Sequence, residues 1–323
     1  MQYTQLGRTG AKVSRLALGT MNFGWHTDED ASTAIMDAGL DAGVNFFDTA
    51  DIYGAGASES ILGRWFAAEK SRRDKVVLAT KLYIPFDDSP NAGGLSALHI
   101  RKACEDSLRR LQTDHIDLYQ FHHIDRTTPW EEIWEATERM VRDGKVVYVG
   151  SSNFAGWNLA AAQEAAKARH FLGLVSEQSI YNLMERTIEL EVLPAARHYG
   201  IGLLPWSPLA GGLLAGAAAK AGRRGDESAM LGHSAREQRI ADNLTRLQAY
   251  EDLAAELDLT PTVLALAWLL SRPGVTAPVL GPRTLDQLTG SFAALDVTLD
   301  PRTLARLDEL FPGPGEAPES YTW

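Results

Sequence analysis

The dominant feature of this sequence is a regular alternation of short apolar runs, rich in β-branched residues, with longer amphipathic stretches. The short runs are almost continuously hydrophobic, which is typical of strands buried on both faces of a parallel sheet. We expect eight strands, at residues 16–18, 44–47, 76–79, 116–121, 146–149, 174–176, 201–204 and 277–280. Apolar residues at spacings of three and four predict helices over residues 28–42, 59–68, 96–111, 130–142, 157–168, 189–198, 243–257 and 261–270.

Eight strands, each followed by helical sequence, predict an α/β fold of the (β/α)₈ TIM-barrel type. Residues 2–14 predict an N-terminal β-hairpin that precedes the barrel. No linker rich in proline or serine divides the chain, so we expect a single domain over residues 1–323. Residues 217–236 predict a long loop after the seventh strand, and residues 313–323 predict an irregular tail.

The competing α/β architecture is a doubly wound nucleotide-binding sheet. It requires G-x-G-x-x-G or G-x-x-x-x-G-K-[ST] after an early strand, and neither pattern occurs. The sequence therefore favours the barrel.

Charge, cysteine content and hydropathy restrict the class of protein. The 31 Lys and Arg against 42 Asp and Glu give a net charge of −11, which argues against nucleic-acid binding. The single cysteine, Cys104, allows no intrachain disulfide, zinc finger or iron–sulfur site. The N-terminus carries no signal-peptide pattern, and the longest apolar run, 263–270, is too short to cross a bilayer. We expect a cytoplasmic protein with no membrane partner.

Polar side chains stand at the carboxyl ends of the predicted strands, where a barrel of this type carries its chemistry. A lysine after a buried strand, Lys81, needs a counter-charge, and Asp48 at the end of the preceding strand supplies it. A cation beside Tyr53 is expected to lower the pKa of the phenol, which suits it to donate a proton to a carbonyl oxygen. A neutral His122 is suited to hold that oxygen.

Two other interpretations of these residues remain open. Asp48 and Lys81 alone are compatible with a structural ion pair. His122 with His123 and Asp125 is compatible with a metal site, as in a metal-dependent barrel hydrolase or isomerase. No other histidine lies at a strand end, so we expect no metal.

Seven segments spread over nearly the whole chain carry a resemblance to a known family. They are GVNFFDTADIYGAGASESILG, VVLATK, SLRRLQTDHIDLYQFHH, GKVVYVGSSNF, SEQSIYNLMER, GIGLLPWSPLAGGLL and VLGPRTLDQL. With them the chain resembles the aldo-keto reductase superfamily. The resemblance implies a (β/α)₈ barrel that reduces aldehydes and ketones with NADPH. It places the family's catalytic tetrad on Asp48, Tyr53, Lys81 and His122.

The resemblance also implies the residues that bind the cofactor NADPH/NADP⁺. Those expected at the nicotinamide are Ser152, Asn153, Gln178 and the stacking Trp206. Those expected at the pyrophosphate are Ser207, Leu209, Gly211 and Leu213. Those expected at the adenosine end are Gly281, Arg283, Gln287 and Ser291, the last of which stands where the family often has asparagine.

Some of these positions have a second interpretation. Gln287 completes a helix capping box with Thr284, and Arg283 is either a ligand of a 2′-phosphate or an exposed surface residue. Lys220, Arg223 and Arg224 either fold over phosphates or belong to a solvated loop.

Aromatic and imidazole side chains near the strand ends are candidates for an apolar substrate pocket. They are Phe23, Trp25, Tyr83, Phe86, His123 and Trp130. The expected partner is a small-molecule carbonyl substrate. The alternative is a cofactor-binding regulatory protein, because the resembling family includes channel β-subunits. The sequence leaves the oligomeric state open.

Overall fold

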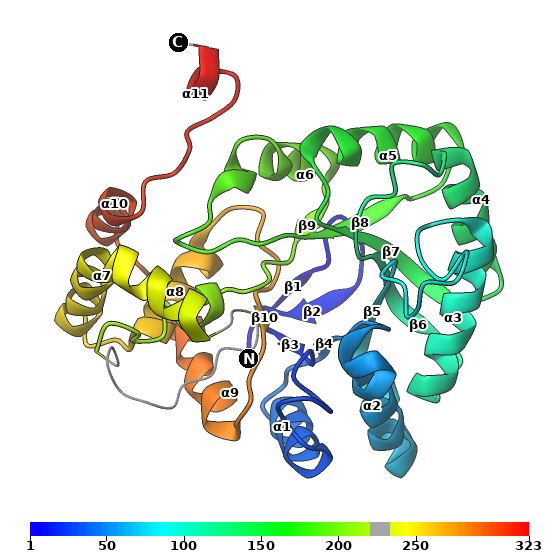
Figure 1. Cartoon of the computed structure of the whole chain (residues 1–323), viewed down its shortest axis with the longest axis horizontal. Helices are drawn as coiled ribbons and strands as arrows, with labels where there is room; N and C mark the ends of the chain where they lie inside the picture. Colours follow the sequence, from blue (N-terminus) through cyan, green and yellow to red (C-terminus); the bar gives the residue numbers. More distant parts are fainter. Residues whose placement is uncertain (220–232, 323) are drawn as a thin grey trace.

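The computed structural model describes residues 1–219 and 233–322. Its centre is a sheet of eight parallel strands in the order β10-β3-β4-β5-β6-β7-β8-β9 (Figure 1). The strands are β3 (Ala17–Gly19), β4 (Phe46–Asp48), β5 (Val77–Leu82), β6 (Ile116–Phe121), β7 (Val146–Ser152), β8 (Leu174–Gln178), β9 (Gly202–Leu203) and β10 (Val279–Leu280).

Backbone hydrogen bonds join the two ends of this sheet. Thr276 N donates to Leu203 O at 2.8 Å, and Val279 N donates to Pro205 O at 2.8 Å. These bonds connect the β9 region to the segment that leads into β10, so the sheet curls into a barrel. The predicted (β/α)₈ fold is confirmed.

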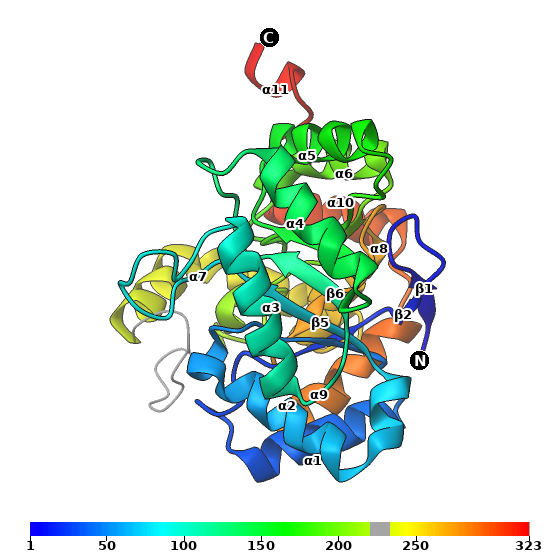
Figure 2. The same ribbon diagram turned by 90° about the vertical axis from the view of Figure 1, so that its right-hand side faces the viewer.

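An antiparallel hairpin of β1 (Tyr3–Gln5) and β2 (Lys12–Ser14) precedes the barrel, as predicted. Figure 2 shows it at the opposite end of the barrel from helix α7. Leu6 in its turn is fully buried and packs with barrel-interior residues such as Phe46 and Leu118. Gly7 has φ +54°, and a Cβ there would lie 2.3 Å from Val175 O, so only glycine allows the hairpin to approach this closely.

Helices surround the barrel, and all but the short α11, which has no buried residue, bury part of their surface in the core (Figure 1). They are α1 (Glu29–Asp41), α2 (Ala57–Ala68), α3 (Ala97–Leu111), α4 (Trp130–Arg142), α5 (Gly156–Ala168), α6 (Val192–Tyr199), α7 (His233–Glu256), α8 (Pro261–Ser271), α9 (Leu285–Ser291), α10 (Pro301–Leu310) and α11 (Glu319–Thr322). Side chains cap several N-termini; Ser96 accepts from His99 N, and Thr260 accepts from Val263 N before Pro261.

Several predicted helix and loop boundaries differ from the structure. Helix α7 begins at His233 rather than at residue 243, so the predicted loop over 217–236 ends earlier. The first buried apolar side chain of α7 is Ile240, which explains why the periodicity gave no sign of the first turns. Helix α6 begins at Val192 after a 3₁₀ turn, and the tail contains the short α11. Residues 220–232, with Lys220, Arg223 and Arg224, lie outside the described residues.

Within the described residues, no single helix has the length and apolar character needed to cross a membrane. One pair of consecutive helices, Ala235–Glu256 and Pro261–Ser271, has this length and apolar character when taken together, but the two helices are bent by 87° relative to each other.

Candidate active site

The structure brings the four predicted catalytic residues to one end of the barrel. Asp48 is the last residue of β4 and pairs with Ala79 of β5. Lys81 lies two residues beyond Ala79 in the same strand, and so faces the same side as Ala79. His122 follows β6 directly, and Tyr53 opens the 3₁₀ helix η1 (Tyr53–Gly56). Strands β5, β7 and β8 are longer than predicted, so Lys81, Ser152 and Gln178 belong to the rigid strands rather than to loops.

Lys81 is fully buried and its ammonium makes three hydrogen bonds. Nζ donates to Asp48 Oδ1 at 2.6 Å, to Thr49 O at 2.8 Å and to Tyr53 Oη at 3.3 Å. Burial alone would lower the pKa of Lys81, but the charge of Asp48 and the contact with Tyr53 outweigh it and raise the pKa. Lys81 therefore keeps its charge inside the barrel.

The second oxygen of Asp48 holds two amides. Gln120 Nε2 donates to Asp48 Oδ2 at 2.9 Å, and Gln178 Nε2 donates to it at 2.8 Å. Gln120 was not predicted. Its place in the sequence could have identified it. Gln120 alternates with Tyr119 and Phe121 along β6, so its side chain faces the barrel interior, where a polar group needs a hydrogen-bond partner.

The Tyr53 hydroxyl is not shifted as the sequence suggested. Burial raises the pKa of Tyr53, and the nearby Lys81 offsets only part of that effect. The expectation of a lowered pKa is corrected, because it considered the cation without the low-dielectric surroundings. Tyr53 consequently carries its proton at neutral pH, which is the state that a proton donor requires.

His122 lies beside Tyr53 with the two ring centroids 5.8 Å apart and the planes at 79°. Burial, with the positive charge of Lys81, lowers the pKa of His122 to about 3. The imidazole is therefore neutral at physiological pH. Its Nδ1 is buried without a hydrogen-bond partner in the described part of the chain.

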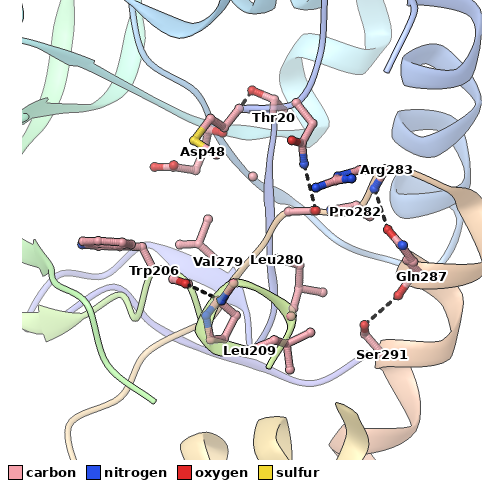
Figure 3. A pocket seen from close by; sticks show the side chains of 18 of the residues that line it. Thr20, Asp48, Trp206, Leu209, Val279, Leu280, Pro282, Arg283, Gln287 and Ser291 are labelled. Atoms are coloured by element: carbon pink, nitrogen blue, oxygen red, sulfur yellow. Dashed lines mark hydrogen bonds between the residues drawn. The ribbon is translucent and has the colours of Figure 1, made fainter. Parts of the chain in front are cut away.

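A cavity of about 680 Å³ opens at this end of the barrel. Its wall runs from Asp48, Tyr53 and His122 past Trp206 to Gln287 and Ser291 (Figure 3). The predicted cofactor residues on the wall are Ser152, Asn153, Gln178, Trp206, Ser207, Leu209, Gly211, Gly281, Arg283, Gln287 and Ser291. Leu213 is fully buried and does not line the cavity.

Asn153 is the central connection at the catalytic end of the cavity. Its backbone has φ +61°, a strained value for a residue with a side chain. Nδ2 donates to His122 O at 3.1 Å and to Ser152 Oγ at 3.0 Å, and Oδ1 accepts from Trp206 Nε1 at 3.1 Å. The amide thus ties the residue after β6 to the indole after β9.

The far end of the cavity is formed by the start of α9. Thr284 Oγ1 accepts from Gln287 N at 3.3 Å, and Gln287 Oε1 accepts from Arg283 N at 2.8 Å. Gln287 therefore contributes to the start of α9, but its side chain bonds to Arg283 N rather than to Thr284 N as in a full capping box, and Gln287 also lines the cavity. Ser291 Oγ donates to Gln287 O at 2.7 Å, so its hydroxyl hydrogen is already used within the helix.

The side chains proposed for a substrate pocket are absent from the described cavity wall. Phe23 is fully buried in the core, Trp25 is 59% exposed, and the Tyr83 and His123 rings lie 5.4 Å apart. Phe86 lies beneath the Arg110 guanidinium, and Trp130 stacks on Trp134. The apolar side chains on the wall near the tetrad are instead Met21, Ile52 and Ile84.

Two buried carboxyl groups close to the site were also not predicted. Asp51 is 1% exposed, and both of its oxygens are without a hydrogen-bond partner in the described residues. Glu59 accepts from Thr80 Oγ1 at 2.5 Å and from Arg110 Nε at 2.7 Å. Burial, reinforced by the charge of Glu59, raises the pKa of Asp51 to about 7.

No group of three or more His, Cys, Asp and Glu side chains within residues 1–219 and 233–322 is arranged to hold a metal ion.

Comparison with known proteins assigns the family. The sequence profile of the Aldo/keto reductase family matches residues 15–311. The chain is 56% identical to an uncharacterized oxidoreductase, YrpG, of Bacillus subtilis (strain 168), over 100% of both chains. The chain belongs to the aldo/keto reductase family, which places it among the oxidoreductases.

Two more distant relatives have names that differ in kind. A probable voltage-gated potassium channel subunit beta of Oryza sativa subsp. japonica is 35% identical over 99% of this chain and 100% of its own length. The versiconal hemiacetal acetate reductase of Aspergillus parasiticus is 33% identical over 96% of both chains.

Proposed function

We propose that the protein is an NADPH-dependent reductase that converts an aldehyde or ketone to an alcohol, with Tyr53 as general acid. The observation that carries this proposal is the Tyr53 hydroxyl, which lies 3.3 Å from the buried Lys81 ammonium while Tyr53 lines the cavity beside His122. A protonated phenol with a cation behind it is suited to give a proton to a bound carbonyl, because the cation stabilises the phenolate that remains.

The roles of the other three residues follow from their contacts. When bound, the reduced nicotinamide supplies the hydride to the carbonyl carbon. Tyr53 gives its hydroxyl proton to the carbonyl oxygen, so the new O–H bond forms as the phenolic one breaks. Lys81 stabilises the phenolate, and Asp48 holds Lys81 charged and in place. A neutral His122 donates a hydrogen bond to the carbonyl oxygen and positions it.

The cavity has features that suit a dinucleotide. Asn22 is 5% exposed and lines the wall, and its Oδ1 is buried without a partner in the described residues, which favours a polar ligand there. Trp206 offers an indole face for a nicotinamide ring. Gly212 has φ +88°, and among the described residues a Cβ there would meet only Arg236 Nη2, at 3.9 Å, so these residues leave room at this point of the wall. In this proposal Arg283, Gln287 and Ser291 hold the adenosine end.

The substrate end of the cavity favours a carbonyl compound with an apolar substituent. Met21, Ile52 and Ile84 supply apolar wall near the tetrad. Removing apolar surface from water contributes about 25 cal/mol per Å², so an aromatic or aliphatic aldehyde gains affinity there.

The proposal is tested by following NADPH oxidation with a panel of aldehydes and ketones. Tyr53→Phe removes the proton donor and is expected to lower kcat by at least about a hundredfold, since general acid catalysis contributes roughly 10²–10⁴. The Kd of NADPH should stay within about twofold. Tyr199→Phe, which removes a hydroxyl on α6 far from the cavity, is the control and should match the parent. A Tyr53→Phe enzyme with turnover within a few-fold of the parent would show that another group is the acid.

A second candidate function is a cofactor-binding regulatory subunit. The full-length relationship to a probable channel subunit beta favours it. The two functions differ in turnover. A purified protein that consumes many equivalents of NADPH with a carbonyl substrate supports the enzyme, whereas a protein that completes a single turnover and retains its nucleotide supports the regulatory role.

A further inference from the structure

A buried carboxylate lies behind the turn that carries Asn153. Glu177 is the penultimate residue of β8 and is fully buried. It pairs in register with Ser151, while the adjacent Gln178 pairs with Ser152 and lines the cavity. Because side chains alternate along a strand, Glu177 lies on the opposite face of β8 from Gln178. No cofactor or substrate role has been given to it so far.

Glu177 accepts three hydrogen bonds, all from neutral donors. Oε1 accepts from Phe154 N at 3.1 Å and from Ser179 Oγ at 2.7 Å, and Oε2 accepts from Ser151 Oγ. Burial raises the pKa of Glu177 to about 7, although these hydrogen bonds favour the ionised form. Keeping a carboxylate here is therefore unfavourable for stability alone, because a buried charge with only neutral partners is costly.

The partners of Glu177 lie on both sides of the nicotinamide end of the cavity. Phe154 directly follows Asn153, whose strained φ of +61° requires the flanking backbone to be held. Ser179, on the other side, accepts from Trp206 N through its carbonyl oxygen at 3.0 Å. The two branches meet again where Trp206 Nε1 donates to Asn153 Oδ1 at 3.1 Å. One carboxylate thus anchors a closed loop of contacts through Asn153 and Trp206.

We propose that Glu177 is a positioning residue for cofactor binding, which fixes Asn153 and Trp206 in the geometry that receives the nicotinamide. This inference rests on the proposed function, since it assumes that the cavity binds a nicotinamide cofactor. Glu177 acts through Phe154, Ser179 and Ser151 and does not itself line the cavity. A glutamine fills the same volume but carries no negative charge. Its amide can donate to Ser151 Oγ, which accepts as well as donates, so Phe154 N and Ser179 Oγ then bond to a neutral carbonyl oxygen, which is a weaker acceptor than a carboxylate.

The test compares four variants by calorimetric titration with NADPH and by steady-state kinetics. Glu177→Gln is expected to raise the Kd of NADPH about tenfold, and Glu177→Ala more, because bonds to a charged acceptor are lost. Ser179→Ala removes only the hydrogen bond from Ser179 Oγ to Glu177 and should raise the Kd of NADPH by a smaller factor. The control is Glu138→Gln, which alters a carboxylate of α4 that is 7% exposed and bonded to Arg142 and Arg169. It should lower the Tm without changing the Kd.

Comparing the effects on KM and Kd with the effect on kcat distinguishes a residue that positions the cofactor site from one that only stabilises the fold. Glu177→Gln should raise the KM for NADPH by the same factor as the Kd, while kcat at saturation stays within about threefold of the parent. Glu177→Ala should raise both the KM and the Kd further than Glu177→Gln does. A Kd within twofold of the parent in Glu177→Gln would overturn the inference, whether or not Glu177→Ala folds. A parent that binds neither NADPH nor NADH would instead contradict the proposed function itself.

Discussion

Two neighbouring aspartates in one short segment show how surroundings decide the role of a residue. Asp48 accepts from an ammonium and two amides, so its charge is satisfied inside the barrel. Asp51, three residues later, is equally buried but has no hydrogen-bond partner within the described residues. The sequence identified Asp48 because its position at a strand end is recognisable. Asp51 follows the same strand in the segment FFDTADIY, but no role was predicted for it, because the burial of its carboxyl depends on the packing of α2 and α3.

Arg283 is the residue on which cofactor preference is expected to depend. It lines the far end of the cavity in a protein of net charge −11, where an additional phosphate needs a local cation. A charged hydrogen bond contributes about 1.5–3 kcal/mol, so we expect NADPH to be preferred over NADH by about ten- to a hundredfold. Arg283→Ala should narrow this ratio, mainly through kcat/KM for NADPH.

The control for that measurement changes the net charge by the same amount elsewhere. Arg142→Ala removes an exposed arginine of α4 and should leave the NADPH-to-NADH ratio unaltered. A parent that prefers NADH, or an Arg283→Ala ratio equal to the parent's, would remove Arg283 from this role.

At the scale of elements, strands and capped helices are predictable because their signals are local. All eight strands lie where the apolar runs placed them, and Ser96 and Thr260 cap the helices that follow. The strands β5, β7 and β8 extend further than predicted because polar residues follow each apolar run: Thr80 and Lys81 in β5, Ser151 and Ser152 in β7, and Glu177 and Gln178 in β8. Of these polar residues, Ser152 and Gln178 line the cavity, so the hydrophobic pattern ends where the strands carry cavity-lining side chains.

The residues that line the cavity near the tetrad could not be predicted from local sequence patterns. Aromatic side chains were expected on the wall, but Phe23 and Trp130 pack into or against the core. Whether a loop residue faces the core or the cavity depends on backbone conformation, as at Tyr83 with φ 144°. Sequence periodicity carries no information on such loops.

One buried arginine links helix α10 to the segment after β8, in addition to the apolar packing of Leu307 and Phe311, and it allows a prediction of stability. Arg186 Nη1 donates to Asp308 Oδ1 at 2.6 Å and to Phe311 O at 2.7 Å, and Nε donates to Glu189 Oε1 at 2.9 Å. Arg186→Ala removes the donor from the buried Phe311 O and from the largely buried Glu189 carboxylate, and is expected to lower the free energy of unfolding by about 3 kcal/mol. Urea unfolding followed by circular dichroism measures this change.

A second ion pair of the same helix is the matched control. Arg306 bonds to Glu256 on α7, but both side chains are exposed, at 40% and 56%. Arg306→Ala should therefore cost less than about 1 kcal/mol. Equal losses in the two variants would mean that burial of the Arg186 contacts does not decide how α10 is held.

At the scale of the whole molecule, buried titratable groups shift the stability of the fold with pH in opposite directions. The pKa of Asp51 and that of Glu177 are both raised to about 7 by burial, so each favours folding at low pH. For His122, burial lowers the pKa to about 3, so the unfolded chain binds the extra proton in acid and folding is favoured as pH rises. The proposed active site is thus also a determinant of acid and base stability.

Asp51→Asn tests this coupling. Below its unfolded pKa of 3.8, Asp51 is protonated in both states and has no effect. As pH rises from 3.8 to about 7, the unfolded chain ionises first, and the free energy of unfolding falls by up to about 4 kcal/mol. Asparagine cannot ionise, so thermal unfolding should show the variant gaining stability over the parent between pH 4 and pH 8.

Asp125→Asn is the control for Asp51→Asn, and its expected change in stability relative to the parent has the opposite sign. Burial alone would raise the pKa of Asp125, but hydrogen bonds from Leu95 N, Thr127 and Thr128 outweigh it and lower the pKa. Its ionised form therefore stabilises the fold above pH 3.8, and Asp125→Asn should be less stable than the parent by a nearly constant amount from about pH 5 to pH 8. If Asp51→Asn followed the parent in parallel from pH 4 to pH 8, the Asp51 carboxyl would have to find, in solution, partners that keep its pKa near that of the unfolded chain.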